Sequence, residues 1–292
     1  MLKVSFKIFA GIILCLAVST VGFACSDSLK NLIQPGVAGK NGFTIVTRQA
    51  NVVYPEILNG QQDFFKDYVQ KFAVNRRAYL QRTYARSKKF FPKATAILKK
   101  YKVPPEFAVL LALESAFNPN AVSSAGAVGY WQIMDDVAKE YGLKITENQE
   151  KTIKPAAKKP QAGTAKAGAI EVPALLDERK NFQKSTHTAA RYLKDRMRNL
   201  NNDWLLVAAS YNWGVGNVWN ALQRTGKANP GFWDIKDKLP SETRSYVMNF
   251  IALNTIFKNY QNFLDNKLCF QDVVRHNKSE NDVSLKTIFE IQ

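Results

Sequence analysis

The sequence predicts a mainly α-helical protein. Apolar residues recur at helical spacing over residues 61–100 and again from residue 185 onwards, with Lys and Arg between them. Pro104-Pro105 introduces a stretch that is apolar on all sides, which is typical of a buried helix, and Asn118-Pro119 ends it. No clear run of alternating strands follows, and the one strand that we predict is short, at Phe43–Val46.

Helix boundaries follow from Pro92 and from three short polar residues. Proline removes a backbone donor, so Pro92 is expected to divide the 61–100 segment into two helices. Ser185, Asp203 and Ser241 each stand before a helical pattern, where such side chains accept hydrogen bonds from the first free backbone amides. We therefore expect one helix to begin at each of these three positions.

The first 24 residues have the pattern of a secretory signal peptide. Two lysines precede an apolar run from Ile8 to about Val21, and Gly22-Phe23-Ala24 is a small-x-small cleavage pattern. The alternative is an uncleaved membrane anchor, but the run is short for a spanning helix, which needs about 20 apolar residues. Cys25 follows the cut, as in a bacterial lipoprotein, although Gly22 stands where Leu is usual. Lipidation and simple secretion both stay open, and the expected location is the periplasm or the outer membrane.

Charge and cysteine content indicate the kind of partner. The net charge is +17, which favours polyanionic partners such as peptidoglycan with its peptide carboxylates, or anionic lipid. Nucleic acid fits export badly, and solubility alone would also explain the charge. Because Cys15 leaves with the apolar run, Cys25 and Cys269 remain, either free or bridged to each other, which is too few for a disulfide framework.

The chain is expected to contain five segments after residues 1–24 are removed. The loop at 147–172 is rich in Lys and Ala and nearly lacks large apolar residues, so we interpret it as a flexible insertion. The segments are a flexible leader at 25–60, a helical arm at 61–100, a main domain at 101–262, the loop at 147–172 inserted in that domain, and a tail at 263–292.

Glu114 is the candidate catalytic residue. It stands at the end of the predicted buried helix, directly after seven apolar residues. Burial disfavours the charged form of a carboxyl group and raises its pKa. A carboxylic acid that stays protonated near neutral pH can protonate a leaving group, as the cleavage of a glycosidic bond requires. The alternative is a glutamate at a helix end that simply turns into water.

The residues that follow Glu114 predict a groove for a sugar chain. Residues 121–129 are rich in Ser, Ala and Gly, which let a glycan approach the backbone closely. Residues 130–134 then supply aromatic faces and an amide, although Trp131 could pack in the core instead. Tyr211, Asn212 and Tyr246 come from later helices, and a buried phenol usually finds a partner.

A series of motifs in this order resembles the lytic transglycosylase domain of the soluble and membrane-bound type D class. The resemblance covers about Ala94 to Tyr260. Its residues are Glu114-Ser115, Asn118-Pro119, Ala121, Ser123, Gly126-Ala127, Gly129, Trp131-Gln132, Met134, Tyr141-Gly142-Leu143, Tyr211-Asn212-x-Gly214 and Glu242-Thr243-Arg244-x-Tyr246-Val247.

The resemblance implies a lysozyme-like α+β fold in which Glu114 acts first as an acid and then as a base. Such enzymes need no metal or cofactor and cleave the β-1,4 bond between N-acetylmuramic acid and N-acetylglucosamine. The muramoyl 6-hydroxyl attacks its own anomeric carbon and leaves a 1,6-anhydro end. One carboxylate suffices because the acetamido group of the substrate stabilises the cation, an exception to the two-carboxylate rule. The implied groove residues are Ser115, Gln132, Met134, Tyr211, Asn212 and Tyr246.

Other functions are less well supported by the sequence. Asp135 stands where the family usually has Pro, so a hydrolytic muramidase that holds water with Asp135 or Asp136 is the alternative. A catalytically silent glycan-binding protein and a basic structural protein at a membrane surface are further alternatives. The only histidines are His187, which we interpret as an exposed helix residue, and His276, too few for a His-rich metal site.

Overall fold

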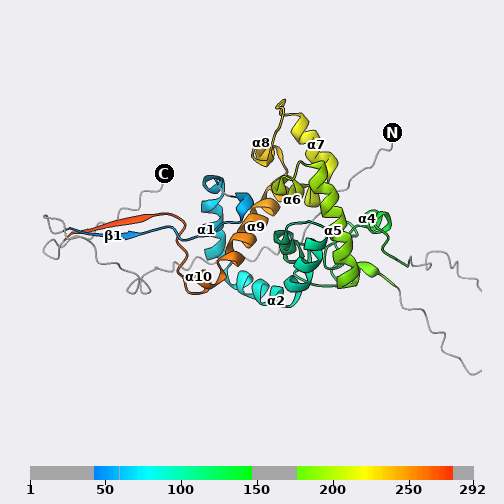
Figure 1. The fold of residues 1–292 in the computed structure, drawn as a ribbon, viewed down its shortest axis with the longest axis horizontal. Coiled ribbons are helices and arrows are strands. Elements are labelled where there is room, and N and C mark those ends of the chain that lie inside the picture. The colour runs from blue at the N-terminus through cyan, green and yellow to red at the C-terminus, as the bar shows by residue number, and fades with distance from the viewer. Residues whose placement is uncertain (1–42, 59, 147–175, 279–292) are drawn as a thin grey trace, which may run out of the picture. The chain divides into compact units, whose positions relative to one another are not determined.

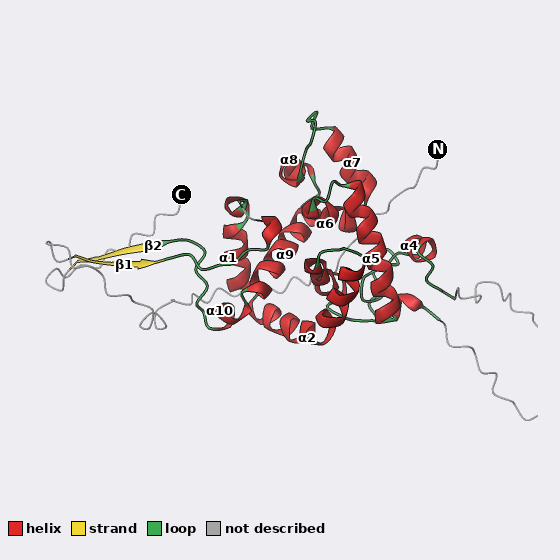
Figure 2. Cartoon of the chain, in the orientation of Figure 1, coloured by secondary structure: helices red, strands yellow, loops and turns green. Residues whose placement is uncertain are grey.

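The computed structural model describes residues 43–58, 60–146 and 176–278 (Figure 1). Most of these residues are helical, and two short strands accompany the helices (Figure 2). The prediction of a mainly α-helical protein is therefore confirmed. The predicted signal peptide, Cys25 and the predicted loop at 147–172 lie outside the described residues. Within the described ranges, none of the helices combines the length and the apolar character needed to cross a membrane.

The described chain divides into two compact units. The larger contains residues 81–250, and the smaller contains residues 43–80 and 251–278. The boundary falls within α2 (Arg77–Lys100) and again within α9 (Ser241–Lys258), so each of these helices has residues in both units. All of the predicted groove residues belong to the larger unit.

The smaller unit joins residues from the two ends of the described chain. Strand β1 (Phe43–Arg48) pairs antiparallel with β2 (Val273–Lys278), with Phe43 opposite Lys278 and Arg48 opposite Val273. The predicted strand therefore exists, and its partner lies in the segment expected to be a tail. Asn259 also connects the two ends, because its side chain accepts from the Val53 amide at 2.9 Å and donates to the Val53 carbonyl at 2.7 Å.

The other elements of the smaller unit are short helices and one buried cysteine. Cys269 is buried and its thiol donates to the carbonyl of Gln271 at 3.0 Å. The helices are η2 (Glu56–Leu58), η3 (Gln62–Phe64), α1 (Lys66–Asn75) and α10 (Tyr260–Leu264).

The larger unit packs its helices around a core that includes Trp131, Phe107, Phe250 and Leu193, all at most 2% exposed. The rings of Phe107 and Phe250 lie 5.4 Å apart, so the helix that leads to Glu114 is packed directly against α9. The elements after α2 are η4 (Pro105–Val109), α3 (Leu110–Ser115), α4 (Asp135–Glu140), η6 (Glu178–Lys180), α5 (Phe182–Asn199), α6 (Trp204–Trp213), α7 (Val215–Gln223), α8 (Phe232–Ile235) and η7 (Lys236–Lys238).

Two predicted helix boundaries are wrong and two are confirmed, one of them because α9 begins at Ser241. Helix α2 continues through Pro92, which lies on its exposed side where water can bond the carbonyl that the missing amide leaves free. The capping residue of α5 is Asn181, which accepts from the Lys184 amide at 3.0 Å, whereas Ser185 is buried inside the helix. Asp203 caps α6 as predicted and accepts from the amides of Leu205 and Leu206.

Candidate active site

Glu114 lies in the last turn of α3, where the backbone turns sharply. Ala116 and Phe117 both adopt left-handed backbone angles, with φ of 49° and 65°. Their amides close the helix end by donating to the carbonyls of Ala112 and Leu111 at 3.2 and 3.1 Å. Two consecutive residues with side chains in this region cost of order 1–3 kcal/mol each, and such strain clusters at functional sites. The turn therefore marks the region of Glu114 independently of any motif.

The carboxyl group of Glu114 is held largely away from water. Burial raises its pKa from 4.5 to about 8, which outweighs the opposite effect of a hydrogen bond from the Tyr246 hydroxyl. That hydroxyl donates to Oε1 at 2.5 Å. Glu114 is thus mostly protonated at neutral pH, which is the state that a general acid needs.

Three phenols from three helices lie within reach of the charge of this carboxyl group, and one of them bonds it. Tyr246 belongs to α9, Tyr211 to α6 and Tyr192 to α5, and a charge on Glu114 would raise the pKa of each of them. Tyr211 donates to the carbonyl of Trp131 at 2.7 Å, and its ring meets that of Tyr192 edge-on at 5.6 Å. Burial is the largest cause of the raised pKa values of Tyr211 and Tyr246, so both remain neutral hydrogen-bond donors.

Ser115, Gln132 and Asn212 make hydrogen bonds inside the protein. The Ser115 hydroxyl donates to the Tyr130 carbonyl at 2.9 Å, and the Gln132 side-chain nitrogen donates to the carbonyls of Ala121 and Gly129 at 3.0 Å. Asn212 accepts from the hydroxyl of Thr243 at 2.8 Å, which joins α6 to α9. These bonds hold the elements around Glu114 in place.

Met134 and Trp131 belong to the same segment before α4 but differ in burial. Met134 is partly exposed and stands directly before α4 with an extended backbone. Trp131 is fully buried, and its ring nitrogen donates to the Thr186 hydroxyl at 2.9 Å. Trp131 is therefore a core residue, the alternative considered for it, and it contributes its backbone carbonyl to Tyr211.

Asp135 is paired with a buried arginine that the sequence did not single out. Arg179 is 5% exposed and forms ion pairs with Asp135 and with Asp177, whose Oδ2 lies 2.8 Å from Nη2. Its Nη1 also donates to the Ile133 carbonyl at 3.3 Å. Arg179 therefore connects η6, α4 and the loop that carries Gln132.

Tyr192 is the second site residue absent from the sequence prediction. It stands in the middle of α5, and no motif distinguishes it from other residues of an amphipathic helix. The prediction that His187 is exposed is wrong, because it is only partly exposed and its Nδ1 lies 3.0 Å from the Tyr101 hydroxyl. Among the described side chains, no group of three or more His, Cys, Asp or Glu residues is placed to hold a metal ion.

Replacing Tyr246 by Phe should raise the pKa of Glu114 further. The hydroxyl of Tyr246 stabilises the carboxylate, so its loss removes the one effect that lowers this pKa. We expect the pKa to rise, because the lost hydrogen bond favours the charged form by about 1 kcal/mol. NMR titration of the labelled carboxyl carbon measures it, with Tyr101→Phe as a control, because Tyr101 bonds His187 and not Glu114. A lower or unchanged pKa in Tyr246→Phe would contradict this account of the pair.

The site thus combines a carboxylic acid of raised pKa, a phenol bonded to it and two further phenols within reach of its charge. The family model described as the transglycosylase SLT domain matches residues 93–166 and 160–231, a region that contains Glu114, the loop to Met134, and Tyr211 with Asn212. Residues 93–231 therefore match the transglycosylase SLT domain, in agreement with the resemblance seen in the sequence.

This chain spans less than half the length of the curated lytic murein transglycosylase that it matches. The membrane-bound lytic murein transglycosylase D of Escherichia coli is 31% identical over 206 residues, which are 70% of this chain and 39% of that protein. The 70 kDa soluble lytic transglycosylase of E. coli is 18% identical with a TM-score of 0.42, covering 73% of this chain and 34% of its own. An inactive mutant of the lytic transglycosylase Slt of Pseudomonas aeruginosa is 19% identical with a TM-score of 0.41, covering 59% and 24%.

Proposed function

We propose that this chain is a peptidoglycan lytic transglycosylase with Glu114 as its only acid and base. The observation that carries the proposal is the carboxyl group of Glu114, whose pKa is raised to about 8 and which is bonded by Tyr246. The match to the transglycosylase SLT domain and the similarity to a lytic murein transglycosylase support the substrate class.

The proposed reaction needs one proton donor and no water. Glu114 gives its proton to the glycosidic oxygen as the bond from the muramoyl anomeric carbon breaks. The resulting carboxylate then takes the proton of the muramoyl 6-hydroxyl as that oxygen bonds to the same carbon. Glu114 recovers its proton, and the products are a free 4-hydroxyl end and a 1,6-anhydromuramoyl end. The acetamido group of the substrate stabilises the positive charge between the two steps.

The groups around Glu114 have separate proposed roles. Tyr246 orients the carboxyl group, and Tyr211 ties α6 to the Trp131 carbonyl. Tyr192 encloses the acid from the side of α5. Ser115, Gln132, Met134 and Asn212 shape the groove for the glycan, the first two mainly by fixing backbone that lines it.

The ion pair of Asp135 argues against a hydrolytic muramidase. A second carboxylate that activates water must be free to contact that water, but the Asp135 carboxylate is held in an ion pair with Arg179. Asp136 is exposed on α4, whereas catalytic groups work best in a site from which water is largely excluded. One acid acting alone accounts better for this geometry.

Analysis of the cleavage products tests the proposal. Purified protein would be incubated with peptidoglycan, and the released muropeptides would be identified by mass spectrometry. We expect 1,6-anhydro ends, which are lighter than reducing ends by one water. Reducing ends would instead identify a hydrolytic muramidase, and binding to peptidoglycan without cleavage would identify a silent glycan-binding protein.

We also propose that the protein acts in the cell envelope, exported by the predicted signal peptide and anchored by a lipid on Cys25. The substrate lies outside the cytoplasm, and Cys25 directly follows the predicted cut at Ala24. Growth with labelled palmitate should therefore label the wild type and Cys269→Ser but not Cys25→Ser. Cys269 is a suitable control because it is buried. Unlabelled wild-type protein in the soluble envelope fraction would show that the protein is secreted without an anchor.

A further inference from the structure

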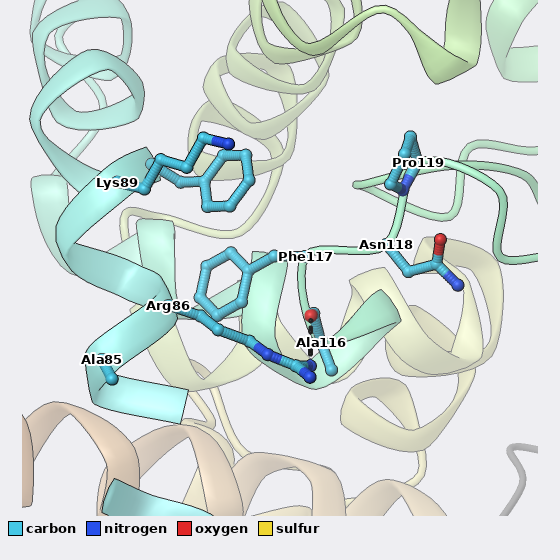
Figure 3. A pocket seen from close by; sticks show the side chains of 8 residues that line it. Ala85, Arg86, Lys89, Ala116, Phe117, Asn118 and Pro119 are labelled. Carbon is cyan, nitrogen blue, oxygen red and sulfur yellow. Dashed lines mark hydrogen bonds between the residues drawn. The ribbon is translucent and has the colours of Figure 1, made fainter. Parts of the chain in front are cut away.

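A pocket of about 670 Å³ lies between α2 and the turn that follows Glu114. Figure 3 shows Arg86 and Lys89 on α2 facing Phe117, with Asn118 and Pro119 on the turn. The rings of Phe90 and Phe117 are stacked at 5.2 Å and supply its apolar part. The complete lining is Ala85, Arg86, Lys89, Phe90, Ala116, Phe117, Asn118 and Pro119.

The pocket is strongly positive. Residues 81–100 of α2 contain seven Lys and Arg and no Asp or Glu. Arg86 donates to the Ala116 carbonyl at 3.2 Å, and the Lys89 ammonium lies 5.6 Å from the centre of the Phe90 ring. Within the part of the chain that the structure describes, neither cation forms an ion pair with a carboxylate. Their charge is therefore available to a ligand.

Further basic side chains lie on the same face of α2, and one of them lines a second pocket. Arg82, Arg86, Lys89 and Lys93 stand at intervals of four, three and four residues, which places them on the same side of a helix. Lys93 lines a pocket of about 570 Å³ together with Phe182. The Phe90 ring lies 5.3 Å from that of Phe182, so an aromatic contact joins the linings of the two pockets.

We infer that the pocket of Arg86 and Lys89 binds a carboxylate of the peptide stem that hangs from the glycan strand. This inference rests on the proposed function. The stem starts at the muramoyl sugar whose bond is cleaved, and the pocket begins at Ala116, two residues after Glu114. Stem peptides combine carboxylates with aliphatic groups, which match two cations above apolar rings.

A concave site fits a peptide better than it fits a membrane. An anionic lipid surface is flat and attracts exposed cations wherever they stand on a helix. Here two cations share a pocket with an aromatic floor, and one of them also holds the Ala116 carbonyl beside the acid. Binding of a stem carboxylate at Arg86 would therefore act on the same turn that positions Glu114.

Charge reversal at Lys89 tests the inference by kinetics. Lys89→Glu removes neither partner of the Arg86–Ala116 bond, and Lys99→Glu is the matched control because Lys99 is exposed on the same helix and does not line either pocket. On strands that carry peptide stems, Lys89→Glu should raise KM about tenfold, with kcat changed by less than about twofold. On strands stripped of stems by an amidase, the ratio of the variant KM to the wild-type KM should be much smaller. Equal ratios on both substrates, or an equal effect of Lys99→Glu, would overturn the inference.

A direct binding measurement separates this inference from the proposed reaction. Calorimetry with the tetrapeptide released from peptidoglycan should show binding to the wild type, at least about fivefold weaker binding to Lys89→Glu, and weak binding of the tetrapeptide with amidated carboxyl groups. This result can be obtained even if the protein cleaves no glycan. Equal binding of the amidated peptide would overturn the inference. So would a Lys89→Glu variant that keeps its peptide affinity but no longer sediments with phosphatidylglycerol vesicles, because the cations of α2 would then contact a membrane.

Discussion

Glu114→Gln should lower the cleavage of peptidoglycan at least about 100-fold while the protein stays folded. Glutamine keeps the shape of the side chain and can still accept the hydrogen bond from Tyr246, but it has no proton to give to the glycosidic oxygen. General acid–base groups contribute about 10²–10⁴-fold, and here one group supplies both the acid and the base. Clearance of turbid cell-wall suspensions measures the loss.

The control for this substitution is an exposed carboxylate of the same unit. Asp136→Asn removes a negative charge from α4 without touching the phenols around Glu114. Its activity should stay within about threefold of the wild type, since surface substitutions away from special contacts have small effects. If Asp136→Asn were as inactive as Glu114→Gln, two carboxylates would be required and the single-acid mechanism would be wrong.

The same substitution should change the pH dependence of stability. The pKa of Glu114 is raised from 4.5 to about 8, so the folded protein binds this proton more tightly than the unfolded chain does. That contribution to stability is complete below pH 4.5 and is lost as pH rises through about 8. Glutamine does not titrate, so Glu114→Gln should gain up to about 5 kcal/mol of unfolding free energy relative to the wild type between acidic and alkaline pH. Urea unfolding at several pH values measures this gain. If the wild type instead became more stable than Glu114→Gln as the pH rises, the pKa of Glu114 would not be raised by folding.

Local chemistry explains which elements could be predicted from the sequence. Asp203 caps α6 because one side chain and two nearby amides suffice for that interaction. Pro92 did not end α2. A helix tolerates proline where the carbonyl that loses its amide partner faces water, and this depends on how the whole helix packs. Ser185 is buried because α5 begins earlier, at an asparagine whose capping role depends on where the chain leaves η6.

Site residues that belong to a sequence motif could be predicted. Site residues whose role comes only from packing in the folded protein could not. Glu114 and Tyr246 are 132 positions apart, yet each stands in a motif of the resemblance to lytic transglycosylases, so both could be named together. Tyr192 and Arg179 have no comparable local signal, since a tyrosine on α5 or an arginine after Asp177 gains its role only from neighbours distant in sequence. Trp131 belongs to a motif, but its burial gives it a place in the core.

Gly129→Ala should unfold the larger unit or destabilise it by about 3–4 kcal/mol. The residue has φ of +82°, and an added Cβ would lie 2.3 Å from the backbone oxygen of Arg179 and 2.8 Å from its carbonyl carbon. Backbone atoms cannot move aside as the end of a flexible side chain can. The left-handed conformation costs about 1–2 kcal/mol for a residue with a side chain, and overpacking adds about 1–3 kcal/mol.

Gly142→Ala separates the cost of the backbone angle from the cost of the close contact. Gly142 has φ of +78°, and nothing lies within 4 Å of its added Cβ, so this variant should lose only about 1–2 kcal/mol. At Gly129 the displaced backbone belongs to Arg179, and the carbonyl of Gly129 itself accepts from Gln132 at 3.0 Å, so the damage should reach the loop beside Glu114. Urea unfolding of the two variants measures the difference. Equal losses would mean that η6 can move away from the loop, and that the close approach of Gly129 to Arg179 does not hold the site together.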